Sequence, residues 1–193
     1  MGYFEYVMVL VSIIIGLALT HILTALGGAI HRLRGHGLPI KLDAIYLIWI
    51  VSVLLFLVSF WWAEFKFQES ITEWTFGLYL FLITFAISQF LLAVILVPTG
   101  MKGVNDSYEY FMAGRRWFFG AFFVVTILDL IDTALKGVDW AARPIVLIQA
   151  AVVFTFCVVG SVSEHKVVQL GIAVILMAIG LFYMFSGLGV LGS

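Results

Sequence analysis

The chain of 193 residues is 64% hydrophobic and only 11% charged, with a formal net charge of −1 and a mean hydropathy of +1.17. A soluble domain carries about 25% charged residues, and one buried core cannot absorb this excess of apolar surface. The small net charge also argues against nucleic acid as a partner, so the composition indicates a protein whose main partner is the lipid bilayer.

Six long apolar runs follow one another along the chain, separated by short polar loops. A hydrocarbon core of about 30 Å is crossed by about 20 helical residues. Helices are expected because lipid tolerates only helices or closed barrels, and the runs lack the alternation of a barrel strand. We therefore predict one all-α domain over residues 1–193, a polytopic membrane helix bundle with transmembrane helices at about residues 6–30, 44–64, 74–98, 117–135, 145–161 and 167–191.

Lysine and arginine are unevenly shared between the two sets of loops. Seven lie in the loops after the first, third and fifth runs, and three lie on the other side. Because cytoplasmic loops carry the excess of these residues, we expect the first set in the cytoplasm and both termini outside (N-out, C-out), in a plasma membrane or bacterial inner membrane. Tryptophans near helix ends, such as Trp49 and Trp117 at the inner side, are expected to anchor the protein at the interface.

The first run carries a small residue at every fourth position over five positions. That spacing forms one slowly turning ridge, and small ridges let membrane helices approach closely. We expect the first helix to pack against two or more neighbours, with a ridge made of Ser12, Gly16, Thr20, Thr24 and Gly28.

His21 lies beside this ridge, in the inner half of the first run. An ionisable group at membrane depth is a functional candidate, as a proton relay, a metal ligand or a haem ligand. The other three histidines fall in predicted loops, so paired histidine ligation of haem within one chain is poorly supported. The alternative is a neutral imidazole bonded to a neighbouring helix, for which Gln89 lies at a similar depth.

Asp129 and Asp132 lie in the outer half of the fourth run, three residues apart and therefore on one face. Asp132 is spaced to pair with Lys136 near the membrane surface. Asp129 lies about one turn deeper and has no basic residue four positions away. Its carboxyl should be protonated, paired with another helix, or facing water.

Three further polar residues are predicted at a comparable outer depth: Glu5 at the start of the first helix, Glu64 at the end of the second and Gln149 in the fifth. If these side chains converge with Asp129, they form an acidic vestibule able to bind a cation or a proton. The sequence does not show whether they converge.

Residues 101–116 form the longest predicted cytoplasmic loop, in which aromatic residues followed by two arginines suggest an interfacial stretch on anionic lipid. We find no catalytic motif, no metal-ligand set and no sequence feature that requires a cofactor, which argues against an enzyme. Three hypotheses stay open: binding or passage of a small solute, proton or cation along an intramembrane polar path; a non-catalytic subunit or sensor that binds a partner protein or a second copy; and a membrane-embedded redox, metal or haem protein.

Overall fold

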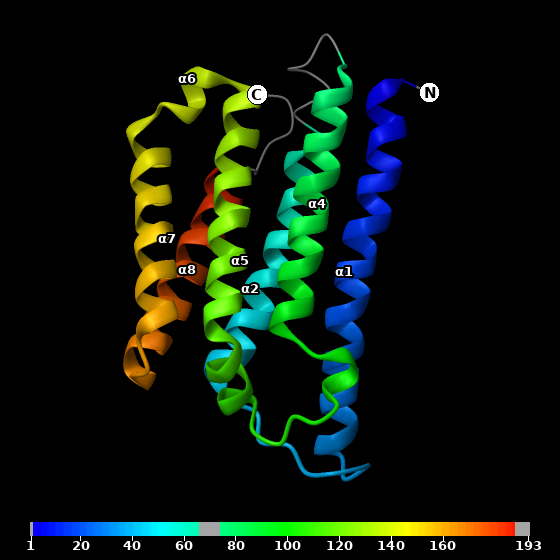
Figure 1. The fold of residues 1–193 in the computed structure, drawn as a ribbon, viewed down its shortest axis with the longest axis vertical. Coiled ribbons are helices and arrows are strands. Elements are labelled where there is room, and N and C mark those ends of the chain that lie inside the picture. Colours follow the sequence, from blue (N-terminus) through cyan, green and yellow to red (C-terminus); the bar gives the residue numbers. More distant parts are fainter. Residues whose placement is uncertain (1, 66–73, 188–193) are drawn as a thin grey trace.

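The computed structural model describes residues 2–65 and 74–187, and it confirms an all-α bundle of six long helices (Figure 1). No β-strand forms within these ranges. A short 3-10 turn, η1 (Thr99–Met101), and a short helix, α6 (Val138–Ala141), lie in two of the connections. The long helices are α1 (Tyr3–Leu33), α2 (Ala44–Ala63), α4 (Phe76–Leu96), α5 (Ser107–Lys136), α7 (Pro144–Val162) and α8 (Lys166–Gly187).

All six long helices are long and apolar enough to cross a membrane. Large apolar side chains also cover the outside of the bundle; Leu17, Trp117 and Val167 are all more than half exposed. Such a surface suits lipid and not water. The protein is therefore a membrane-spanning helix bundle.

Successive long helices run in opposite directions. We call the end where α1, α4 and α7 begin the N-terminal end of the bundle; α2, α5 and α8 finish there (Figure 1). Helix α1 packs against α4 and α2. Helix α5 packs against α4 and α7, and helix α8 packs against α2 and α7. Helices α2 and α5 therefore run parallel, and their last residues meet at the N-terminal end.

Capping residues explain where two of the helices begin. The Asp43 side chain accepts a hydrogen bond from the Ile45 backbone N–H, and Asp106 accepts from the Tyr108 and Glu109 backbone N–H groups. Helix α5 therefore begins at Ser107, ten residues before the predicted start at 117. The predicted loop over residues 101–116 is wrong in its second half, because the helix capped by Asp106 includes residues 107–116, where the sequence is less apolar.

Two connections are fastened together at the opposite end of the bundle. The Lys41 ammonium pairs with Asp106 at 2.9 Å, and the Ser107 backbone N–H donates to the Lys41 carbonyl at 3.0 Å.

The turn η1 approaches α1 closely at Gly100. Gly100 has a φ of +60°, which glycine adopts without strain. Its carbonyl lies so close to Gly28 of α1 that a Cβ there would be 2.6 Å from the oxygen.

An aromatic cluster fills the interface between α2 and α5. The Trp49 ring, 1% exposed, packs against four phenylalanines of α5, with ring centroids 4.9 Å apart for Phe118 and 5.5 Å apart for Phe119. The prediction that Trp49 anchors the protein at the membrane interface is wrong, because the α5 cluster encloses it. Trp117 is 77% exposed, as an interfacial residue should be.

Candidate functional site

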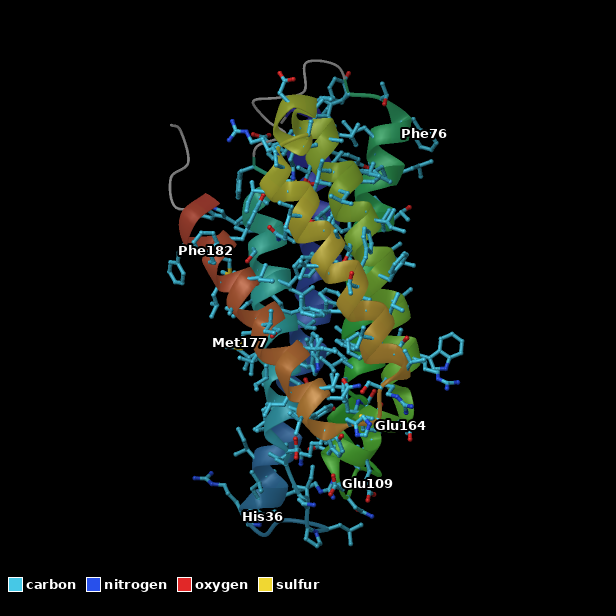
Figure 2. The ribbon with its side chains drawn as sticks, turned by 90° about the vertical axis from the view of Figure 1, so that its left-hand side faces the viewer. His36, Phe76, Glu109, Glu164, Met177 and Phe182 are labelled. Carbon is cyan, nitrogen blue, oxygen red and sulfur yellow. The ribbon has the colours of Figure 1, made fainter. Side chains whose placement is uncertain are left out.

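A cavity of about 400 Å³ lies between α2, α5, α7 and α8. Figure 2 shows α7 and α8 diverging from the turn that joins them, so that α8 stands away from α7 near Phe182. The cavity lining extends from Trp49 to Glu64 on α2 and from Phe122 to Lys136 on α5. At a rise of 1.5 Å per residue these stretches are each about 20 Å long. The cavity is therefore elongated along the helix axes.

An ion-pair cluster forms the wall of the cavity at the N-terminal end of the bundle. The Lys136 ammonium donates to Glu64 Oε1 at 2.9 Å and to Asp132 Oδ2 at 2.5 Å. The Glu64 side chain is fully buried, and the side chains of Asp132 and Lys136 are 6% and 12% exposed. The pair of Asp132 with Lys136 is the one expected from their spacing. Glu64 joins it because α2 and α5 end side by side.

Each carboxylate of this cluster has one oxygen without a partner. Glu64 Oε2 and Asp132 Oδ1 are buried, and neither accepts a hydrogen bond from any described residue. Buried carboxylate oxygens left in this state are costly unless something else donates to them. Each of these two carboxylates therefore keeps one acceptor that no described donor satisfies.

Asp129 adds a third carboxyl one turn further into the cavity. Its backbone carbonyl accepts from the Thr133 hydroxyl at 2.8 Å, but no hydrogen bond or ion pair joins its carboxyl to the described residues. The cavity thus contains three carboxyls, from Glu64, Asp129 and Asp132, and one ammonium. When all four are ionised, the site carries an excess of negative charge that a cation would offset.

Hydroxyl groups along the cavity present acceptors and not donors. Ser52, Ser59, Thr126 and Thr133 each donate to a backbone carbonyl of their own helix, at 2.7 to 2.9 Å. A hydroxyl has only one hydrogen to donate but two acceptor lone pairs. The polar lining of these two helices therefore favours a ligand that donates hydrogen bonds.

The structure brings four of the sequence candidates, Glu64, Asp129, Asp132 and Gln149, into this cavity. Glu5 is not among the lining residues. It lies exposed at the start of α1, where its carboxylate accepts from the Gly2 backbone N–H at 2.9 Å. The outer polar residues Glu64 and Gln149 thus meet Asp129 in one cavity, as considered from the sequence, whereas Glu5 of α1 does not.

His21 lies apart from the cavity. Its Nε2 is 2.8 Å from the Val97 carbonyl oxygen, at the point where α4 ends before Pro98. Gln89 is not its partner. The Gln89 side chain is buried in α4, and neither atom of its amide finds a partner among the described residues. His21 is therefore not among the residues that line the cavity with Asp129.

The small-residue ridge of α1 makes contacts mainly at its two ends. Ser12 accepts a hydrogen bond from the Trp61 indole N–H at 2.9 Å, and Gly28 meets the Gly100 carbonyl. A Cβ on Gly16 would contact nothing within 4 Å, and Thr20 and Thr24 are exposed. Helix α1 packs instead through an adjacent row of buried residues, Val11, Ile15, Ala18, Ile22 and Ala25.

The sequence interpretation missed the non-acidic lining of the cavity. Ser52, Phe56, Ser59 and Ala63 recur at spacings of three and four on α2, and on α5 Thr126 and Thr133 lie on the same face as the predicted Asp129. A face of polar side chains on an otherwise apolar helix was the available signal, since such a face avoids lipid.

Within residues 2–65 and 74–187, no group of three histidine, cysteine, aspartate or glutamate side chains is arranged to hold a metal ion. Comparisons of the chain with protein-family models, with curated protein sequences and with solved structures give no match. The functional argument therefore rests on the geometry of the cavity.

Proposed function

We propose that the protein binds a small cation in the cavity between α2, α5, α7 and α8, as a step in its passage across the membrane. The observation that carries this proposal is the Asp129 carboxyl, which lines the cavity without a hydrogen bond or ion pair to the described residues. Ionisable groups at membrane depth mark ion and proton paths. Lys136 balances only one of the three carboxyls around the cavity, so a second positive charge is stabilised there.

The expected orientation of the helices indicates which face of the membrane lies nearer to the charged end of the cavity. Seven of the ten lysines and arginines lie in the connections after α1, α4 and α7 or in the helical turns beside them. The positive-inside rule then places the opposite end of the bundle in the cytoplasm. In that orientation, we expect Glu64 and the carboxyls of α5 in the outer half of a plasma or bacterial inner membrane.

The test uses purified protein in proteoliposomes. Uptake of protons, sodium, potassium and methylammonium is measured for the wild type, for Asp129→Asn and for the matched control Asp139→Asn, whose side chain is exposed on α6. We expect at least one cation to enter wild-type vesicles, and its uptake to fall at least tenfold in Asp129→Asn but not in the control. Size-exclusion profiles and helical content of the three proteins establish that all of them are folded.

The proposal fails if no cation enters wild-type vesicles or binds the purified protein, or if Asp129→Asn behaves as the wild type. A protein that co-purifies in fixed stoichiometry, with both aspartate variants retaining it, would then favour the second hypothesis, a non-catalytic subunit that binds a partner.

A further inference from the structure

We infer that the ligand of this cavity is an amphipathic organic cation. Its ammonium head would bind at the Asp129 carboxyl, and its apolar or aromatic body would lie deeper in the cavity, along Phe56 and Phe122. The inference rests on the proposed function, because it specifies which class of cation the same site takes. Three properties of the cavity support it: its size, the separation of a charged end from an uncharged end, and the distribution of its charges.

The cavity is too large for a bare inorganic ion. Its volume of about 400 Å³ lies within the range of about 300–1,000 Å³ that is typical of small-molecule sites. An inorganic cation needs several oxygens converging at about 2–2.6 Å. In this cavity the carboxyls do not converge on one point: Glu64 and Asp132 pair with Lys136, and Asp129 lies outside these pairs. Among the described residues, no group of three histidine, cysteine, aspartate or glutamate side chains could hold a metal ion.

The charged groups lie at one end of the lining. Glu64 directly follows α2 and Asp132 and Lys136 lie in the last turns of α5, whereas Trp49, Phe56 and Phe122 line an uncharged part that begins about two turns deeper. The Phe122 ring centroid is 6.0 Å from that of Trp49 and 6.4 Å from that of Phe56, and Phe122 packs edge-on against both rings. An elongated ligand with a charged end and an apolar end matches this arrangement.

The charges show where the head would bind. Lys136 already donates to Glu64 and Asp132, whereas the Asp129 carboxyl, one turn deeper, has no such donor among the described residues. The nearby Thr133 hydroxyl donates to the Asp129 backbone carbonyl, so its oxygen remains available as an acceptor. An alkylammonium group supplies the missing donors and the missing positive charge together.

The test measures binding by calorimetry to the full-length protein in nanodiscs. Three probes separate the parts of the ligand: methylammonium has the head alone, 4-phenylbutylammonium has the head and an aromatic body, and 4-phenylbutanol has the body without the charge. We expect 4-phenylbutylammonium to bind the wild type at least tenfold more tightly than either of the other two. Sodium is included as the inorganic cation.

Two variants locate the head and the body. Asp129→Asn should weaken 4-phenylbutylammonium binding at least tenfold, with Asp139→Asn as the control. Phe56→Leu should weaken 4-phenylbutylammonium several-fold and leave methylammonium unchanged. Its control is Phe185→Leu, because the Phe185 ring is exposed on α8 and does not line the cavity.

Each contrary result has a distinct meaning. If sodium or methylammonium binds as tightly as 4-phenylbutylammonium and depends on Asp129, the organic body is not recognised; this inference is overturned and the proposed function stands. If 4-phenylbutanol binds as tightly as the ammonium probe, the site recognises apolar bodies without regard to charge, and the inference is overturned as well. If no cation binds or enters vesicles, the proposed function fails together with the inference.

Discussion

Replacing Lys136 by methionine should destabilise the bundle more than a typical substitution. The variant keeps a long apolar stem but removes the ammonium that donates to Glu64 and Asp132. Both carboxyls then remain in a site where Glu64 is fully buried and the Asp132 side chain is 6% exposed. The loss therefore includes two charge-assisted hydrogen bonds and the cost of leaving two buried carboxyls without a cation.

Two estimates bracket the size of this loss. Hydrogen bonds to charged groups contribute about 1.5 to 3 kcal/mol each, so the two bonds of Lys136, one to Glu64 across helices and one to Asp132 within α5, amount to about 3 to 6 kcal/mol. Removing one partner of a buried ion pair costs about 3 to 5 kcal/mol in soluble proteins. We expect Lys136→Met to lower the free energy of unfolding by about 3 kcal/mol, the lower end of both ranges.

The assay is reversible unfolding in mixed micelles, in which SDS is titrated into a mild detergent and helical content is followed by circular dichroism. Lys102→Met, at an exposed position of the loop after η1, is the matched control and should unfold as the wild type. The triple variant Lys136→Met with Glu64→Gln and Asp132→Asn should recover part of the loss, because it leaves no unpaired carboxylate behind. The reasoning is refuted if Lys136→Met unfolds within about 0.5 kcal/mol of the wild type, a change expected of ordinary surface sites, or if the triple variant is no more stable than the single one.

Two more predictions concern the packing and the loops. Gly28→Ala should destabilise the bundle by about 1 to 3 kcal/mol, because its Cβ would be 2.6 Å from the Gly100 carbonyl oxygen; in the same SDS titration, Gly16→Ala should be neutral or slightly stabilising, since its Cβ meets nothing. The hydrogen bond from Lys41 lowers the pKa of Asp106, so the stability from this pair is present above the ordinary aspartate pKa of about 3.9 and is lost as the pH falls through the lower folded value. Asp106→Asn should therefore melt below the wild type at pH 7 in low salt, with the difference disappearing below about pH 4; an unchanged difference at pH 3 would contradict this origin.

The number of helices was predictable because it depends on composition, and lipid imposes the same length on every span. The start of α5 was not, because hydropathy falls over residues 107–116 while the Asp106 side chain caps a helix that continues beyond the apolar run. A capping residue acts over one turn, so its effect is not visible in an average over about 20 residues.

The candidate site was predictable only in part. The spacing of Asp132 and Lys136 within one helix indicates their ion pair, because residues four apart on a helix are neighbours. Glu64 reaches Lys136 only because α2 and α5 end together, which depends on how the helices pack. Trp49 shows the converse: its position near a helix end suggested the interface, but the phenylalanines of α5 enclose it.

The tethered ammonium of Lys136 has a consequence for how its two carboxylate partners behave in salt solution. Because it is attached to α5 only four residues after Asp132, it competes for the Glu64 and Asp132 oxygens as an intramolecular ligand, at an effective concentration that does not fall when the surroundings are diluted. A dissolved sodium or potassium ion would compete with this ammonium for the same two carboxylates. The Glu64 and Asp132 carboxylates are therefore less available to dissolved ions than the Asp129 carboxyl, which has no cation tethered four residues away.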